Sequence, residues 1–204
     1  MKTLEKQSDN RGFTLLELLV AMTIMLFVMS AIVTTFRSQT RSWVTQQEIA
    51  NLQQNLRAGM YYLERSIRMA GYDPQRSRLF GFVSTFPAPY SGLGATTDDD
   101  DIAFTVDSNA DKVIDNNANE LVAYRINNQN QLQVFDISAG GIASWQTIAN
   151  NITGISFTYL DSDNNVTTTL KSIRTVQITL TAQSSKSSVN STRSLTSRVR
   201  CRNI

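Results

Sequence analysis

The sequence predicts an α+β fold, in which one long N-terminal α-helix packs on an antiparallel β-sheet head. An apolar run at residues 13–36 continues into a segment with one apolar stripe at helical spacing, and no proline precedes Pro74. Beyond Pro74 the chain changes to short alternating segments separated by polar turns, a pattern typical of antiparallel strands. We therefore expect a helix whose first half spans a membrane and whose second half lies against the sheet.

The apolar run is long enough to cross a hydrocarbon core of roughly 30 Å as a helix. Lys2, Lys6 and Arg11 precede it, and only Glu5 and Asp9 offset them. A basic excess before a membrane segment favours a cytoplasmic N-terminus. The sequence therefore predicts a single pass, with the C-terminal part of the chain on the far side of the membrane.

A small residue, Gly12, stands in front of the apolar run, whereas an ordinary secretory signal has its cleavage site behind the run. Cutting after Gly12 would remove a polar leader, residues 1–12, and would keep the apolar helix in the mature protein. The cut would create a cationic amine on Phe13, which could neutralise Glu17, the one carboxylate in the run. The alternative is an uncleaved anchor in which Glu17 lies near the interface.

Residues 12–17 read Gly-Phe-Thr-Leu-Leu-Glu, and this stretch resembles the type III prepilin signal of the type IV pilin and type II pseudopilin superfamily. The resemblance implies that prepilin peptidase cuts between Gly12 and Phe13 and methylates the new amine of Phe13. Glu17 then takes the fifth mature position, whose acid is implicated in docking each subunit into the growing filament. The expected fold is accordingly pilin-like.

The helix is expected to continue well past the apolar run. One face carries apolar residues spaced close to 3.6 apart: Ile49, Leu52, Leu56, Met60, Leu63, Ile67 and Ala70. Gly71 and Pro74 provide a stop signal, so a helix over 13–70 would be roughly 85–90 Å long. This divides the chain into a leader at 1–12, a membrane or filament-core helix at 13–36, an amphipathic continuation at 37–72 and a β-rich head at 73–204.

The head is predicted to contain short strands at 102–106, 121–126, 131–135, 155–159, 176–180 and 194–202. Turns are expected at 127–130 and 161–165, and loops at 87–97 and 182–191. In the last strand, Leu195, Val199 and Cys201 fall on one face, so Cys201 is expected in the core rather than as a reactive thiol.

Three further stretches, at 63–74, 151–161 and 197–203, resemble PilW-like minor pilins. These subunits, with the related J-type pseudopilins of type II secretion, are implied to sit at or near the filament tip and to prime assembly. The implied partners are other pilin and minor pilin subunits, prepilin peptidase, the inner-membrane assembly platform and, as a further candidate, a tip adhesin. The implied location is the inner membrane, with a periplasmic head, and then the pilus at the cell surface.

The charges of the head are segregated along the chain. Residues 98–120 hold eight acids and one base (net −7), and residues 171–204 hold seven bases and no acid (net +7). Such poles influence orientation and partner choice. The arginines of the last strand, Arg198, Arg200 and Arg202, could bind DNA, but a nucleic-acid surface is usually wider and carries stacking aromatics. They are expected to face water or an acidic neighbouring subunit.

Oxygen ligands stand at alternate positions in the acidic part, as in calcium loops, and acids further on could complete the shell: Asp107, Asn109, Asp111, Asp115 and Glu120. The glycine and the bidentate glutamate of an EF-hand are missing, because Lys112 and Ala118 occupy those places. The alternative is a solvated turn. No other cofactor is expected.

No catalytic set is visible in the sequence. The chain has no histidine and one cysteine, which excludes His-based acid–base chemistry and Cys-Cys metal motifs, and no nucleophile motif or phosphate loop occurs. We expect a structural minor pilin rather than an enzyme. A J-type pseudopilin is the nearest alternative, and a membrane-anchored DNA or ligand receptor is an alternative of a different class.

Overall fold

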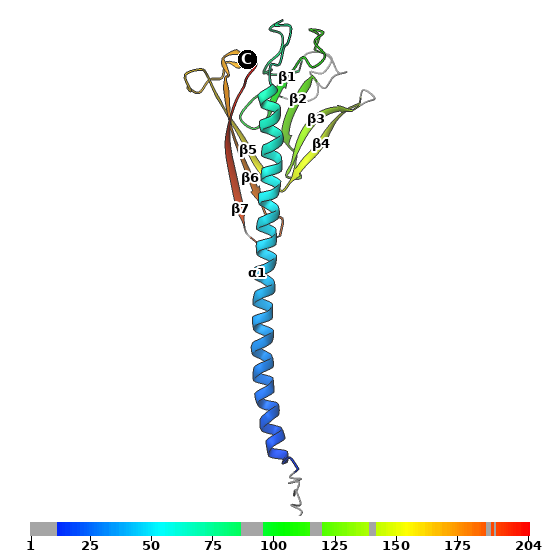
Figure 1. Ribbon diagram of the computed structural model, residues 1–204, viewed down its shortest axis with the longest axis vertical. Helices are drawn as coiled ribbons and strands as arrows, with labels where there is room; N and C mark the ends of the chain where they lie inside the picture. Colours follow the sequence, from blue (N-terminus) through cyan, green and yellow to red (C-terminus); the bar gives the residue numbers. More distant parts are fainter. Residues whose placement is uncertain (1–11, 87–95, 115–119, 139–141, 187–188, 190) are drawn as a thin grey trace, which may run out of the picture. The chain divides into compact units, whose positions relative to one another are not determined.

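The computed structural model describes residues 12–86, 96–114, 120–138, 142–186, 189 and 191–204. The chain forms two compact units, Met1–Gln46 and Gln47–Ile204. A single helix, α1 (Leu15–Met69), begins in the first unit and ends in the second (Figure 1). The seven strands described all belong to the second unit. The predicted α+β architecture, a long apolar helix with antiparallel sheets, is confirmed.

In the first unit α1 exposes its apolar residues on every side. Each large apolar side chain at 13–36 is exposed, from 45% for Val33 to 91% for Phe13. Among the described residues, α1 is the one helix long and apolar enough to cross a membrane, judged by length and composition. The hydroxyl groups of Thr23, Thr34 and Thr35 each donate to a helix carbonyl three or four residues earlier. These polar groups are therefore satisfied within the helix, as a hydrocarbon environment requires.

The second unit contains two antiparallel sheets. The first has the order β1-β2-β3-β4, formed by β1 (Ile102–Thr105), β2 (Leu121–Ile126), β3 (Gln131–Ser138) and β4 (Ile142–Asn150). The second has the order β5-β6-β7, formed by β5 (Ile152–Leu160), β6 (Thr175–Gln183) and β7 (Thr192–Arg200). Every neighbouring pair is antiparallel, which allows short connections between consecutive strands.

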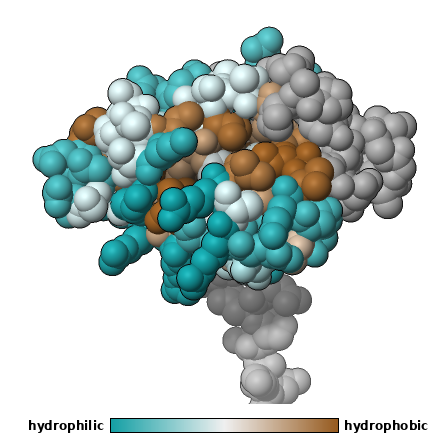
Figure 2. Space-filling view, turned by 90° about the horizontal axis from the view of Figure 1, so that it is seen from above, coloured by the Kyte–Doolittle hydropathy of each residue, from teal (hydrophilic) through white to brown (hydrophobic). Residues whose placement is uncertain are grey.

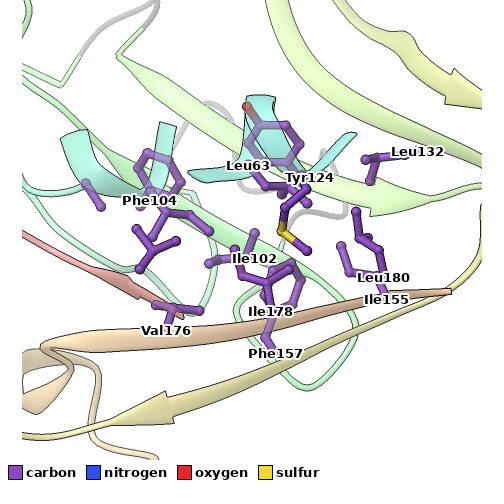
Figure 3. Close-up of a cluster of buried hydrophobic side chains, with 14 of the residues drawn as sticks. Leu63, Ile102, Phe104, Tyr124, Leu132, Ile155, Phe157, Val176, Ile178 and Leu180 are labelled. Atoms are coloured by element: carbon purple, nitrogen blue, oxygen red, sulfur yellow. The ribbon is translucent and has the colours of Figure 1, made fainter. Parts of the chain in front are cut away.

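The core of the second unit lies where the C-terminal part of α1 meets both sheets. The predicted apolar stripe is confirmed, because its residues from Leu52 to Ala70 are buried and only Ile49 is half-buried. Leu63 of α1, Tyr124 of β2 and Ile178 of β6 lie in one cluster (Figure 3). The described surface seen from above is mixed, with hydrophilic areas around hydrophobic ones near its middle (Figure 2). The second unit thus has a buried apolar core, as a folded domain does, and also keeps some apolar side chains exposed.

Gly59 lies where α1 packs closely against both sheets. A Cβ atom at this position would lie 2.9 Å from Leu132 Cδ2 and 3.4 Å from Leu180 Cδ1. The separation of 2.9 Å is shorter than an ordinary van der Waals contact between carbon atoms. The missing side chain therefore lets the helix backbone sit against β3 and β6.

The strand predictions were right in position and incomplete in number. All six predicted strands exist, and the turns at 127–130 and 161–165 close with Asn127 N donating to Gln131 O and Asp161 N donating to Asn165 O. The expected loop at 182–191 begins later, since β6 continues to Gln183, whereas most of the expected loop at 87–97 lies outside the described residues. β4 was missed. The burial of its described side chains, at 144–150, does not alternate strictly, so its sequence carries no clear period-2 signal.

Candidate functional site

Thr14 and Glu17 join in a reciprocal pair of hydrogen bonds at the start of α1. The backbone N–H of Glu17 donates to Thr14 Oγ1 at 3.2 Å, and the backbone N–H of Thr14 donates to Glu17 Oε2 at 3.0 Å. The Thr14 hydroxyl also donates to Glu17 Oε2 at 3.1 Å. This is a capping box, in which the N-cap residue and the third helical residue satisfy each other's backbone donors. The Thr-x-x-Glu spacing is the sequence signal that our prediction overlooked, and it explains why the helix begins at Leu15 rather than at Phe13.

Gly12 and Phe13 lie just outside the helix and are exposed. A Cβ atom built on Gly12 would meet no described atom within 4 Å. The described fold therefore gives no steric reason for a glycine at this position. An exposed peptide bond outside a helix is also the form of backbone that a peptidase can reach.

The acidic turn between β1 and β2 brings three of the predicted calcium ligands together. Asp107 follows β1 and Glu120 precedes β2, and the register pairs Thr105 with Leu121, so both acids lie at the same end of the strand pair. One carboxylate oxygen from each of Asp107, Asp111 and Glu120 lies within 4.8 Å of the other two. Asp107 and Glu120 are fully buried, and Asp111 is exposed.

Hydrogen bonds within the turn fix its shape. The backbone N–H of Asp111 donates to Asp107 Oδ1 at 3.2 Å and to Asn109 Oδ1 at 3.0 Å, and Asn109 Nδ2 donates to Asp111 Oδ2 at 2.8 Å. Asn109 is thus beside the cluster. Asp115 lies outside the described residues. That all five form one ligand shell stays a prediction.

The last strand places its cysteine and its arginines as predicted. Val199 and Cys201 are buried, Leu195 is half-buried, and Arg198 and Arg200 are exposed. Burial raises the pKa of the Cys201 thiol to about 11, so the thiolate is scarce at neutral pH. Cys201 is accordingly a core residue.

Arginine side chains gather at one end of the second sheet. Arg174, Arg200 and Arg202 line a cavity of about 670 Å³, together with Asp161. The cavity is open and mixed in charge. Contact between these arginines and an acidic neighbouring subunit stays a prediction.

Comparison with known protein families decides which class of protein this is. Residues 45–201 match the family described as prepilin peptidase-dependent protein B, and residues 7–33 match the prokaryotic N-terminal methylation motif. The chain belongs to the prepilin peptidase-dependent protein B family. A search of curated proteins found no match. The resemblance to type IV pilin-like, prepilin-type proteins is therefore confirmed.

Family membership gives the motif at the start of α1 its general function. A prepilin-type protein is a substrate of prepilin peptidase, with a methylated N-terminus, and it assembles with other pilin-type subunits. The exposed apolar helix fits an anchor in the inner membrane. The match to the methylation motif covers residues 12–17, where the capping box and the exposed Gly12 occur.

Proposed function

We propose that this chain is a minor pilin, a structural and non-catalytic subunit that prepilin peptidase cuts between Gly12 and Phe13. Its mature form, with a methylated Phe13 amine, enters a type IV pilus at or near the tip and helps to prime assembly. The family match over 45–201 and the methylation motif over 7–33 support this proposal.

The exposed apolar surface of residues 13–36 is the observation that carries the proposal. A large apolar surface without a partner is normally covered in the functional state. Lipid covers it before assembly. Other apolar helices replace the lipid in a filament, and the exchange costs little because both environments are apolar.

Glu17 has two candidate roles in this scheme. Its capping-box bonds to Thr14 stabilise the first turn of α1, and its charge can attract the Phe13 amine of the same or a neighbouring subunit. The first role needs only a hydrogen-bonding side chain, whereas the second needs a negative charge. Substitutions can therefore separate the two roles.

The test compares Glu17→Gln with Thr14→Ala in the full-length protein, and measures incorporation into sheared filaments. Gln keeps the hydrogen bonds of a capping box but has no charge, whereas Thr14→Ala removes the cap and keeps the charge. We expect Glu17→Gln to be excluded from filaments and Thr14→Ala to be incorporated. The reverse result, with Glu17→Gln incorporated normally, would refute the docking role.

Processing is tested at Gly12. We expect Gly12→Arg to retain residues 1–12, which mass spectrometry of the membrane fraction would detect. Since the position makes no described steric contact, the variant should still fold, and uncleaved protein should accumulate. Normal cleavage of Gly12→Arg would show that the site lies elsewhere.

The proposed location follows from the same segments. The N-terminus is cytoplasmic and residues 73–204 are periplasmic before assembly, and the protein then reaches the cell surface in the pilus. The proposed partners are other pilin and minor pilin subunits, the inner-membrane assembly platform and a tip adhesin. Cross-linking from cysteines introduced into the second unit would identify the neighbours, and finding them all in a secretion system would make the chain a J-type pseudopilin instead.

A receptor for DNA or another ligand would need no filament. In β7, Arg198 is exposed, but its Nε already donates to Gln177 Oε1 at 2.7 Å, so this donor is engaged within the sheet. Wild-type protein absent from filaments but retarding DNA in a gel would favour the receptor.

A further inference from the structure

Asp107 is buried by the segment that follows α1. Its backbone N–H donates to Tyr72 O at 2.7 Å, and Gln75 Nε2 donates to Ala110 O at 2.6 Å. These bonds fix the acidic turn onto residues 72–75. Asp107 and Glu120 are both at 0% exposure, although each carries a carboxylate.

One oxygen of the Asp107 carboxylate lacks a donor. Asp107 Oδ1 accepts the backbone N–H of Asp111, but Asp107 Oδ2 is buried and has no hydrogen-bond partner among the described residues. Burying a carboxylate oxygen without a donor is strongly unfavourable. The nearest carboxylates, those of Asp111 and Glu120, add negative charge instead of relieving it.

We propose that Asp107, Asp111 and Glu120 together bind one calcium ion. Oxygen atoms that share a Ca²⁺ ion at about 2.4 Å lie no more than ~4.8 Å apart, and the three carboxylates meet this limit. Hard carboxylate oxygens are the ligands that Ca²⁺ prefers, and the ion neutralises the buried charge. Asn109 Oδ1, which already accepts one hydrogen bond, is close enough in the chain to complete the shell with water.

The ion would join three parts of the second unit: the end of β1, the turn and the start of β2. Since the buried carboxylates come together only in the folded chain, calcium would stabilise the folded state. This inference concerns the second unit alone and holds whether or not the chain is a minor pilin.

The test uses the full-length protein in detergent, stripped with EDTA and then titrated with CaCl₂ by calorimetry, with MgCl₂ in parallel. We expect one Ca²⁺ per chain with a Kd of about 10⁻⁴–10⁻³ M, and a rise in melting temperature on saturation. Asp111→Asn should weaken binding at least tenfold, and Asp107→Asn should abolish it.

Two variants keep the result interpretable. Asp111 is exposed, so Asp111→Asn should fold even if Asp107→Asn does not. Asp163→Asn removes an exposed acid from the 161–165 turn and should bind Ca²⁺ like the wild type. No heat and no change in melting temperature at about 10 mM Ca²⁺ would overturn the proposal, as would equal responses of Asp111→Asn and wild type.

Discussion

The N-terminal and C-terminal parts of α1 have the same backbone conformation but opposite burial. In the part at 13–36, leucines and valines are exposed on all faces. In the part from Gln47 on, a single stripe is buried to 0–4% exposure between two sheets. The difference shows that helix formation alone does not decide whether an apolar side chain packs within its own chain or against other molecules.

The two parts are expected to respond differently to the same substitution. Apolar residues of the second part stabilise the fold of this chain. Those of the first part find their partners in lipid or in other subunits. Substituting the same residue type once in each part therefore tests whether the two parts differ in this way.

The largest expected effect comes from a leucine pair. Leu63→Ala should lower the free energy of unfolding of the second unit by about 2–5 kcal/mol, because it opens a cavity at a fully buried site. Leu19→Ala, at an exposed site, should change it by less than about 0.5 kcal/mol. Denaturant unfolding in detergent, followed by near-ultraviolet circular dichroism, measures both. Similar losses for the two variants would contradict the division of α1.

A glycine pair should give the next largest effect. Gly59→Val should destabilise the second unit by about 1–3 kcal/mol, because its side chain would overlap Leu132. Gly12→Val has no such neighbour and should leave stability unchanged. The same unfolding measurement applies. A small loss for the intermediate variant Gly59→Ala would show that Leu132 can move aside.

A glutamate pair should give a smaller effect. Glu48 is buried beside the apolar stripe. Its Oε2 lies 3.2 Å from Lys186 Nζ, and its Oε1 accepts a hydrogen bond from Ser184 Oγ at 3.0 Å. Glu48→Ala should lower the melting temperature, but by less than Leu63→Ala, since Lys186 is half exposed and regains water. Glu17→Ala should not change the melting temperature of the second unit. Glu48→Gln should recover part of the loss through Ser184.

The smallest expected effect is a pH dependence confined to the second unit. Burial, together with the charges of Asp98 and Asp100, raises the pKa of Asp101 to about 6 from an ordinary value of 3.8. The folded state then holds its proton more tightly than the unfolded state, so stability should fall as pH rises from about 4 to about 6. Asp101→Asn should reduce this fall, and Asp99→Asn should not. Melting temperatures across that range test it.

Much of the fold, and the motif at the start of α1, could be predicted from the sequence because their signals are local. A prepilin-type motif, an apolar run and a 3.6-residue stripe each depend on neighbouring residues, and each was found in the structure or in the family comparison. The strands with strict alternation, such as β6, were also found. β4 was not, because the burial of its described side chains, at 144–150, does not alternate strictly.

The candidate sites also differ in how far the sequence alone could predict them. Gly12, Phe13 and Glu17 are close in sequence, so their association was visible, although the capping bond to Thr14 was overlooked. Burial of Asp107 was not predictable. It arises because residues 72–75 pack on the acidic turn, across a long separation in the chain.

The sequence by itself determined the long helix, its apolar and amphipathic parts, the family signal and most strands, since these depend on the order of residues within a few turns or one strand. Only the tertiary structure decided which carboxylates are buried and that Gly59 packs closely against the sheets. It also decided that the carboxylates of Asp107, Asp111 and Glu120 lie close together. The physical reason is that burial and charge proximity depend on segments that are distant in the chain and become neighbours only when the second unit packs.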